Sequence, residues 1–250
     1  MNGYTIYHYD QVSSTNAIAR MMVQSGAAER NIVLSDFQAG GKGRLNREWS
    51  CPPGKGVLMS MILRPDMNVK DMPQLTLLVA VAVAECLHKV GNCVAGIKWP
   101  NDIIVNNKKI CGILAESIGD SSSRAIIMGI GINVNIKQDE FPAQCRDTST
   151  SLLIEAGHSI PRLQVVKEFL NSWDKHYPKY LNTGYPYLRD KWLSYNHTLG
   201  RSVDVSTNEG VLTGEAFDIS PRGGLIVQLN NGSFREFLAE DVSLGKQYYN

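Results

Sequence analysis

The spacing of apolar side chains divides the first part of the chain into alternating strands and helices. Residues 4–9 alternate and are rich in β-forming side chains. A broad apolar stripe over residues 73–91 is typical of a helix buried against a sheet, and Gly91 is expected to close it. The elements expected in this region are strand 4–9, helix 17–24, strand 31–37, strand 57–63 and helix 73–91.

The middle of the chain continues the same mixture. The dipeptide Asn106-Asn107 lies between two strand-like segments and predicts a β-hairpin, because asparagine tolerates the positive φ angles of a two-residue turn. The further elements expected are strands 103–105, 108–116 and 124–135 and helices 162–180 and 185–194. Together these elements predict an α+β domain with a mixed or antiparallel sheet.

Beyond Leu199 the pattern changes to short alternating runs, joined by turns such as Asn230-Asn231-Gly232. The expected strands are 202–206, 211–219, 225–229 and 233–238. About fifty residues of this kind indicate a small all-β barrel. We therefore expect the chain to divide near residues 197–201, into a domain of residues 1–198 and a second of residues 199–250.

Composition narrows the class of protein. The 250 residues include 25 Lys+Arg and 24 Asp+Glu, so the formal net charge of +1 does not indicate charge-driven binding to nucleic acid. Hydrophobic residues make up 43% of the chain, enough for a core, but no stretch reaches the roughly 18 uninterrupted apolar residues of a membrane span. The N-terminus lacks the features of a secretory signal. Five cysteines without a CxxC pair favour reduced thiols and argue against structural zinc. We expect a cytoplasmic protein without membrane contact.

Residues 38–56 show no apolar periodicity, and their first part, QAGGKGRLNREW, interleaves glycines with Lys42, Arg44 and Arg47. Glycine lets backbone N–H groups approach an anion, and neighbouring cations complete a cradle for phosphate or carboxylate. The spacing fits neither a Walker loop nor a Rossmann fingerprint. A flexible, solvated basic loop is the alternative, although loops longer than about 12 residues in compact domains are usually functional.

A second candidate segment, KWPNDIIVNNKKICGILAE, covers residues 98–116. Pro100 fixes a turn before Asn101 and Asp102, which places two polar side chains at the mouth of the hairpin. Strand alternation puts Lys109 on the same face as Cys111, where a lysine among apolar side chains either reaches solvent or meets an anion. Because both faces of this strand are apolar, alternation does not decide whether Lys108 or Lys109 points inward.

Two further segments have both a structural and a binding interpretation. In GIGINVN, residues 129–135, glycines within a strand indicate either close approach of a ligand or a bulge, and Asn133 and Asn135 are expected on one face. Ser14, Thr15 and Asn16 precede a helix, where polar side chains either bind a ligand or cap the helix. At least one of these three is expected to be a cap.

Other kinds of site find no support in the sequence. The five histidines are scattered, with no HExxH motif and no i, i+4 pair, so they do not indicate zinc chemistry. Ser60 lies in LMSMIL rather than in a G-x-S-x-G motif, so a nucleophile-elbow hydrolase is not indicated either.

Taken together, these segments resemble the biotin protein ligase family, whose members attach biotin to carboxylases. The matching motifs, in order, are SSTN (13–16), QAGGKGRLNREW (38–49), KWPND (98–102), KICGILAE (109–116) and GIGINVN (129–135). The resemblance implies a catalytic domain with a central mixed sheet flanked by helices, like that of class II aminoacyl-tRNA synthetases. It also implies that residues 199–250 form an SH3-like barrel.

The resemblance implies a mechanism with assigned residues. ATP and Mg²⁺ activate biotin to biotinyl-5′-AMP, and a lysine of a biotin carboxyl carrier domain, in acetyl-CoA carboxylase or a related carboxylase, then accepts the biotin. The implied catalytic residues are Arg44, Lys109 and Asp102. The implied biotin-binding residues are Ser14, Thr15, Gln38, Gly41, Arg44, Lys109, Gly112 and Gly131. The implied nucleotide-binding residues are Lys42, Arg47, Trp49, Asn101 and Asn133. Metal ligands are not implied.

The chain departs from the family pattern in its basic loop. Lys42 replaces an arginine, which keeps the charge but loses the bidentate fork, and Asn46 replaces a glycine. Some members also carry an N-terminal winged helix-turn-helix, for which the start of this sequence leaves no room. We therefore expect the monofunctional class without DNA binding. Members occur as homodimers and as monomers, which leaves the association state open.

Two other functions remain as alternatives. A lipoate or octanoate ligase has a related fold but lacks the KWPND block paired with this basic loop. A non-catalytic biotin-sensing protein would keep the pocket without forming the adenylate.

Overall fold

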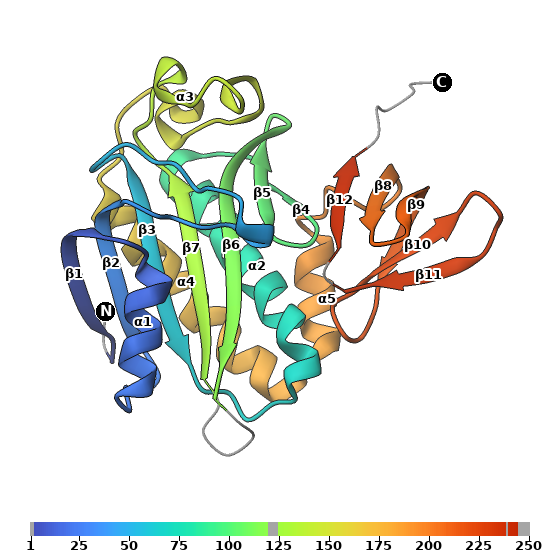
Figure 1. Cartoon of the computed structure of the whole chain (residues 1–250), viewed down its shortest axis with the longest axis horizontal. Coiled ribbons are helices and arrows are strands. Elements are labelled where there is room, and N and C mark those ends of the chain that lie inside the picture. Colours follow the sequence, from blue (N-terminus) through green and yellow to red (C-terminus); the bar gives the residue numbers. More distant parts are fainter. Residues whose placement is uncertain (1–2, 120–124, 239, 245–250) are drawn as a thin grey trace.

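The computed structural model describes residues 3–119, 125–238 and 240–244. The strands of its larger part are β1 (Thr5–Val12), β2 (Asn31–Gln38), β3 (Gly56–Leu63), β4 (Gly96–Lys98), β5 (Asp102–Val105), β6 (Lys108–Ile118) and β7 (Ala125–Asn133). They form one seven-stranded sheet in the order β1-β2-β3-β7-β6-β5-β4 (Figure 1). β1 and β2 pair in parallel, and every other neighbouring pair is antiparallel. The expected mixed sheet is confirmed.

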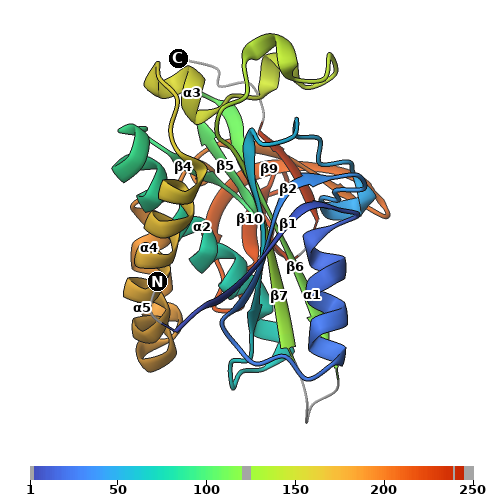
Figure 2. The same ribbon diagram turned by 90° about the vertical axis from the view of Figure 1, so that its left-hand side faces the viewer.

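Helices cover both faces of this sheet. They are α1 (Thr15–Gln24), α2 (Met72–Gly91), α3 (Leu152–Ala156), α4 (Arg162–Thr183) and α5 (Tyr185–Leu193), with 3₁₀ turns η1 (Arg44–Asn46), η2 (Val69–Asp71), η3 (Gln138–Glu140) and η4 (Arg146–Thr148). α1 lies on one face, against β2, β3 and β7, whereas α2, α4 and α5 lie on the other (Figure 2). The α+β class expected from the sequence is therefore confirmed.

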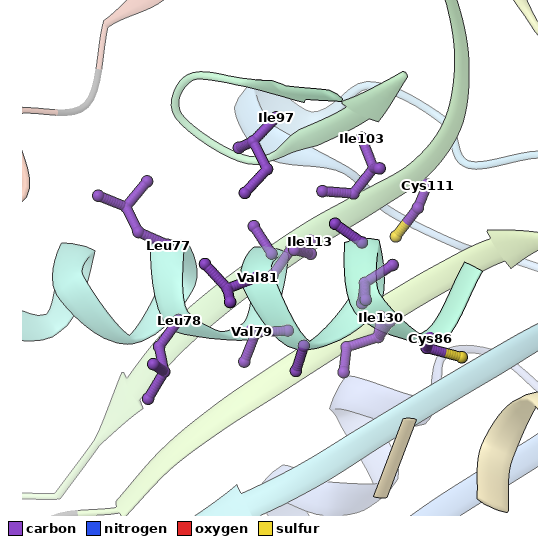
Figure 3. Close-up of a cluster of buried hydrophobic side chains, with 14 of the residues drawn as sticks. Leu77, Leu78, Val79, Val81, Cys86, Ile97, Ile103, Cys111, Ile113 and Ile130 are labelled. Carbon is purple, nitrogen blue, oxygen red and sulfur yellow. The ribbon is translucent and has the colours of Figure 1, made fainter. Parts of the chain in front are cut away.

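Helix α2 is apolar on nearly all sides and lies at the centre of the core. Its Leu77 and Val81 belong to the same buried cluster as Ile97, Ile113 and Ile130 of the sheet (Figure 3). By length and composition this helix could cross a membrane, but 78% of its most apolar 18-residue window is buried inside the protein. A mostly buried helix of this kind is the core helix of a globular fold.

The end of α2 differs slightly from the expectation. The helix includes Gly91, and the left-handed residue that terminates it is Asn92, with φ 50°. Gly91 has a different role, because a Cβ there would lie 2.8 Å from Leu152 Cδ2. The glycine therefore allows α3 to approach the end of α2.

The C-terminal part is a second, smaller sheet. Its strands are β8 (Ser202–Thr207), β9 (Gly210–Ile219), β10 (Leu225–Leu229), β11 (Phe234–Phe237) and β12 (Asp241–Leu244), in the antiparallel order β11-β10-β9-β8-β12. The four expected strands are present, and β12 was not predicted. Residues 239 and 245–250 of the expected barrel, and residues 1–2 of the larger domain, lie outside the described residues.

Hydrogen bonds join the two sheets through the segment that links them. The Trp99 backbone N–H donates to Thr198 Oγ1 at 2.8 Å, and the Trp99 indole N–H donates to the Gly223 carbonyl at 3.0 Å. Gln74 of α2 donates to the Pro221 carbonyl at 2.9 Å. The smaller sheet is thus held against α2 and the turn before β5.

Some boundaries were not anticipated. Strand 124–135 is shorter than expected, because the N–H groups of Val134 and Asn135 bond to the Lys55 carbonyl after β7 ends at Asn133. Residue 124 lies outside the described residues. The two-residue turn is confirmed, with Asn106 at φ 49° and Asn107 at φ 60°.

Candidate functional site

A pocket of about 170 Å³ opens where the N-terminus of α1, the end of β2, the loop before β3 and the middle of β6 and β7 meet. Its lining residues are Ser14, Thr15, Asn16, Gln38, Lys42, Gly43, Arg44, Arg47, Glu48, Trp49, Met59, Asn101, Asp102, Lys109, Gly112, Ile113, Leu114, Gly129, Ile130 and Gly131. Cationic side chains, uncharged polar groups and glycine backbone therefore share one cavity.

An uncharged hydrogen-bonding cluster lies on one side of the pocket. Gln38 Oε1 accepts from the Thr15 backbone N–H at 2.7 Å and lies 3.0 Å from the Thr15 hydroxyl. The Ser60 hydroxyl lies 2.7 Å from Thr15 Oγ1 and 2.5 Å from Asn16 Oδ1. Because the Gln38 carbonyl oxygen is occupied by Thr15, its NH₂ group is the end that can donate to a ligand.

Ser60 was not among the expected site residues. Its sequence context, LMSMIL, speaks only against a nucleophile-elbow serine. Every residue of β3 is buried, so strand alternation gives no clue to which face Ser60 occupies. The available signal was a single hydroxyl in an otherwise apolar buried strand, because a buried polar group requires a partner.

The start of α1 differs from a conventional cap. Ser14 occupies the N-cap position in an extended conformation, but its side chain makes no capping hydrogen bond. The side chains of Thr15 and Asn16 belong to the polar cluster instead. The expectation that at least one of these side chains caps the helix is therefore wrong: Ser14 occupies the N-cap position without a side-chain hydrogen bond to the helix.

The basic loop is held in shape by its own backbone. The Gly43 N–H donates to the Arg47 carbonyl at 2.7 Å, and the Trp49 N–H donates to the Gly41 carbonyl at 2.9 Å. At its tip, Leu45 and Asn46 have φ angles of 54° and 57°. Asparagine tolerates this left-handed region better than most residues, which explains why it stands where the resemblance implied glycine.

The Arg44 guanidinium reaches from this loop to two other parts of the chain. It donates to Asn101 Oδ1 and to the Glu240 carbonyl, both at 3.2 Å. Asn101 is oriented in turn by its own NH₂ group, which donates to the Ile113 carbonyl at 2.8 Å. Arg44 therefore connects the basic loop, the turn before β5 and the smaller sheet.

Lys109 points into the pocket, and its face on β6 corrects one expectation. Its Nζ pairs with Asp102 Oδ1 at 2.6 Å. The register of β5 and β6 shifts at this point, so that Ile104 pairs with Lys109 while Ile103 pairs with Cys111. This irregularity breaks the alternation that had placed Lys109 beside Cys111. Lys109 lies beside Gly112, where a Cβ would be 3.3 Å from its Cε, whereas Cys111 is buried in the core.

Trp49 fills the part of the cavity that lies against two glycines. A Cβ on Gly131 would be 2.5 Å from the Trp49 ring, and one on Gly112 would be 2.9 Å from it. The Lys109 ammonium lies 5.6 Å from the centre of this ring. Within the described part of the chain, the buried Trp49 indole N–H has no hydrogen-bond partner. The glycine surface expected to meet a ligand therefore meets Trp49 in this structure.

Two of the implied site residues do not line the pocket. Gly41 contributes its carbonyl to the loop, and a Cβ there would lie 2.6 Å from the Trp49 carbonyl oxygen. Asn133 is buried, and its NH₂ group donates to the Thr150 carbonyl at 3.0 Å. Asn135 bonds to the backbone of Ile160. Both asparagines thus anchor the segment that follows β7.

The side chains near the pocket that the structure describes offer neither a metal site of three or more protein ligands nor an activated thiol. Among the residues that the structure describes, no group of three or more His, Cys, Asp and Glu is arranged to hold a metal ion. Glu48 and Asp102 are the carboxylates in the lining. Burial raises the pKa of the Cys111 thiol, so this sulfur stays protonated and unreactive.

Comparison with known proteins extends the resemblance to most of the chain. Residues 9–133 match the model of the biotin/lipoate A/B protein ligase family, and residues 198–245 match that of the biotin protein ligase C-terminal domain. The bifunctional ligase/repressor BirA of Bacillus subtilis is 38% identical over 246 residues, covering 98% of this chain and 75% of that protein. The biotin–[acetyl-CoA-carboxylase] ligase of Paracoccus denitrificans is 29% identical, covering 87% of this chain and 92% of that protein.

The fold is also found among solved structures. The biotin protein ligase from Aquifex aeolicus in complex with biotin and ATP superimposes with a TM-score of 0.83 at 28% identity. The match covers 97% of this chain and 99% of that chain. The likeness in fold therefore extends over both the larger sheet and the C-terminal sheet.

Proposed function

The chain belongs to the biotin protein ligase family, and from this premise we propose that it joins biotin to a protein lysine in two steps. In the first, the biotin carboxylate attacks the α-phosphate of ATP, which forms biotinyl-5′-AMP and releases pyrophosphate. In the second, the lysine amine attacks the acyl carbon and releases AMP. The acceptor is the biotin carboxyl carrier domain of acetyl-CoA carboxylase or a related carboxylase, a class named in the similar ligase from Paracoccus denitrificans.

The observation that carries the proposal is the convergence of cations on one pocket. Lys42, Arg44, Arg47 and Lys109 all line it, next to an uncharged polar cluster. The first step brings a carboxylate against a polyphosphate, and that repulsion must be offset by preorganised positive charge. We assign Arg44 and Lys109 to the carboxylate and α-phosphate, and Lys42 and Arg47 to the outer phosphates.

The uncharged end of the pocket suits the ureido group of biotin. Gln38 has an NH₂ group to donate to the ureido carbonyl, and Ser14 and Thr15 offer hydroxyl groups to its N–H groups. The fused rings then require the surface of Gly112 and Gly131 that Trp49 now covers.

Trp49 is suited to leave that surface. Because its indole N–H lacks a partner among the described residues, moving the ring breaks no hydrogen bond of that group. A displaced indole can stack on the adenine, which agrees with the nucleotide role implied for Trp49. Asn101, already bonded to Arg44, lies beside the phosphate end.

Asp102 is suited to the second step. By reference values, the ε-amine of a free lysine has a pKa of about 10.4. It must therefore lose its proton before it attacks. When the phosphate occupies Lys109, the Asp102 carboxylate is released from its ion pair. It can then position the incoming amine or accept its proton.

Mg²⁺ fits this site as a partner of ATP that carboxylates of the pocket would help to hold. Mg²⁺ is typically bound through one or two carboxylates plus substrate phosphates, and Glu48 and Asp102 would supply the carboxylates. When bound, it neutralises charge on the phosphate oxygens. Because the proposed reaction uses ATP and an intracellular carboxylase, we propose that the protein acts in the cytoplasm.

We also propose residues 1–198 and 199–250 as the two structural units. The change from one sheet to the other near Thr198, and the second family match beginning at residue 198, support this division.

An acceptor assay tests the proposed function. The protein is incubated with ATP, Mg²⁺ and either biotin or lipoate, together with a biotin-domain or a lipoyl-domain protein. We expect biotin-dependent pyrophosphate release and a mass gain on the biotin domain. A mass gain with lipoate on the lipoyl domain would show a lipoate ligase instead. Biotin binding without pyrophosphate release would show a non-catalytic sensor.

A further inference from the structure

A chain of hydrogen bonds runs from the surface of the protein to the uncharged end of the pocket. At its outer end, Arg20 donates to Glu116 Oε1 at 2.9 Å, and Asn16 Nδ2 donates to Glu116 Oε2 at 2.7 Å. The side chains of Arg20 and Glu116 are 44% and 32% exposed, whereas Asn16 is buried. Glu116 closes the KICGILAE motif, yet it does not line the pocket and has no role in the two steps above.

The inner end of the chain reaches the wall of the pocket. Asn16 Oδ1 lies 2.5 Å from the Ser60 hydroxyl, which also lies 2.7 Å from Thr15 Oγ1. Thr15 in turn contacts Gln38 through its N–H and its hydroxyl. Asn16, Ser60 and Thr15 are all buried, and hydrogen bonds between buried groups are electrostatically stronger than exposed ones.

The chemistry of Glu116 fixes the direction of the bonds further in. A carboxylate only accepts hydrogen bonds, so Asn16 must turn its NH₂ group outward and its carbonyl toward Ser60. A carbonyl also only accepts, so the single hydroxyl proton of Ser60 is held by Asn16 Oδ1, and the 2.7 Å contact between Ser60 and Thr15 is made by the Thr15 hydroxyl donating to Ser60 Oγ. The lone pairs of Thr15 Oγ1 therefore stay available to an N–H group in the pocket.

The opposite orientation of Asn16 would reverse this result. With its NH₂ group toward Ser60, Asn16 would donate, and the Ser60 proton would turn to Thr15 Oγ1. The acceptor that Thr15 offers a ligand would then be partly used. Gln38 would be unaffected, because its carbonyl is held by the Thr15 backbone N–H.

The backbone beside Asn16 leaves little freedom for another arrangement. A Cβ on Gly129 would lie 2.4 Å from Asn16 Oδ1, so only glycine there lets the carbonyl sit where it does. The Asn16 amide is thus confined by β7 on one side and held by Glu116 on the other.

We propose that Glu116 and Asn16 are positioning residues for biotin: Glu116 sets the orientation of the Asn16 amide, and this sets the hydrogen-bonding polarity that Thr15 presents to the ureido group. The inference rests on the proposed function, because it takes the Thr15 and Gln38 end as the ureido site. In a cyclic urea, an N–H group lies beside the carbonyl. The Thr15 hydroxyl oxygen would accept from that N–H group, and the Gln38 NH₂ group would donate to the carbonyl.

The test compares single and double variants by the KM for biotin in adenylate formation, with the KM for ATP, kcat and the melting temperature measured alongside. Asn16→Asp sets two carboxylates against each other, and we expect the biotin KM to rise about 10- to 100-fold with the ATP KM within about 2-fold. In the double variant Asn16→Asp/Glu116→Gln, the new carboxylate accepts from both the new amide and Ser60. We expect it to recover a biotin KM within about 3-fold of the unmodified protein.

Arg20→Ala is the matched control, because it removes the exposed partner of the same carboxylate but leaves the acceptor that orients Asn16. We expect its biotin KM to change less than about 2-fold, as for other exposed ion pairs. If Asn16→Asp lowers the melting temperature without changing the biotin KM, or if the double variant is no better than the single one, the proposal is wrong.

Two further variants separate this inference from the proposed function. Thr15→Val and Gln38→Ala should both raise the biotin KM if this end of the pocket binds the ureido group. If neither does, the ureido assignment fails and the inference fails with it. If both do while the Asn16 and Glu116 variants behave like the unmodified protein, only the inference is overturned.

Discussion

Lys109 reaches the pocket because β6 is irregular at that point. The sequence alone left open whether Lys108 or Lys109 points inward. A regular strand would have grouped Lys109 with Cys111, which is a core residue. The register shift opposite Ile103 and Ile104 turns the lysine toward Asp102 instead. The sequence therefore indicated a lysine site on this strand, but the bulge that decides its direction depends on pairing with β5.

Removing this lysine should disable the first chemical step. We expect Lys109→Ala to lower the rate of biotinyl-5′-AMP formation about 100-fold or more, because an ammonium that meets developing negative charge is lost. Pyrophosphate release at saturating ATP and biotin measures the effect. Lys108→Ala is the matched control and should stay within about 2-fold, because Lys108 lies outside the pocket lining. Equal losses in both variants would contradict the assignment.

The conformation of Asn46 leads to a second prediction at the scale of single residues. Its φ of 57° follows that of Leu45 at 54°, so the loop tip depends on two left-handed residues in succession. Asn46→Gly should keep activity, whereas Asn46→Val should destabilise the observed conformation of the loop tip by about 1–2 kcal/mol, because a β-branched residue disfavours this region. The KM for ATP in adenylate formation measures the difference. Equal KM values for the two variants would show that the tip conformation is unimportant.

At the scale of elements, the apolar pattern predicted most strands and helices because each buries one face or its whole surface. Helix α2 is the clearest example, since its breadth of apolar residues matches its burial. The short strand β12 was missed, although Asp241–Leu244 alternates, because four residues give little periodicity. The segment after β7 was missed for a different reason: its turns are anchored by side chains such as Asn133 and Asn135, which local patterns do not identify.

Helices α2, α4 and α5 meet at a buried carboxylate that was not predicted at all. Glu85 of α2 accepts from Lys175 at 2.9 Å and from His176 at 2.6 Å, and pairs with Lys89 at 2.9 Å. His176 is also 2.8 Å from the Tyr187 hydroxyl of α5. Burial alone would raise the pKa of Glu85, but hydrogen bonds from its three partners outweigh burial and hold the pKa at about 2, below the ordinary 4.5.

This cluster makes the fold sensitive to acid. A carboxyl whose pKa falls on folding stabilises the fold above its unfolded pKa of 4.5 and loses that contribution as pH falls toward about 2. Burial also lowers the pKa of His176 below 6.5, against the opposing effect of Glu85, so protonating His176 weakens the fold below that pH. Stability should therefore decline from about pH 6.5 downward, and more steeply below pH 4.5.

The variant Glu85→Gln tests this account. We expect a loss of about 2 kcal/mol in the free energy of unfolding at pH 7. This is less than the cost of breaking a fully buried ion pair, because Lys89 and Lys175 are partly exposed to solvent. The difference from the unmodified protein should shrink as pH approaches 3. Asp190→Asn, at an exposed ion pair on α5, is the control and should change stability little. A Glu85→Gln difference that stays constant with pH would contradict the assigned pKa.

At the scale of the whole molecule, the pocket depends on segments far apart in the chain. Gln38 ends β2, Arg44 begins η1 and Asn101 precedes β5, so their motifs could be recognised individually in the sequence. Their convergence could not be derived from spacing, and the family resemblance supplied it. The contact between Arg44 and the Glu240 carbonyl was not predicted, because it joins the basic loop to a sheet that begins about 160 residues later.

The joint between the two sheets gives a prediction at this scale. The Trp99 indole donates to the Gly223 carbonyl across the joint, whereas the Trp192 indole N–H has no partner among the described residues. Both side chains are buried. Trp99→Phe should therefore cost about 1–2 kcal/mol more than Trp192→Phe in the free energy of unfolding by urea, because it leaves a buried carbonyl unpaired. Equal costs would show that the indole bond does not stabilise the joint.

The central claim is that the pocket holds an activated biotin between an uncharged polar end and a cluster of cations. A crystal structure of the protein with biotinyl-5′-AMP tests it most directly. We expect the fused rings beside Thr15 and Gln38, with Trp49 displaced from Gly131, and the phosphate against Arg44 and Lys109. Electron density for the ligand elsewhere, with Trp49 still against Gly131 and the Lys109 to Asp102 pair intact, would contradict the account.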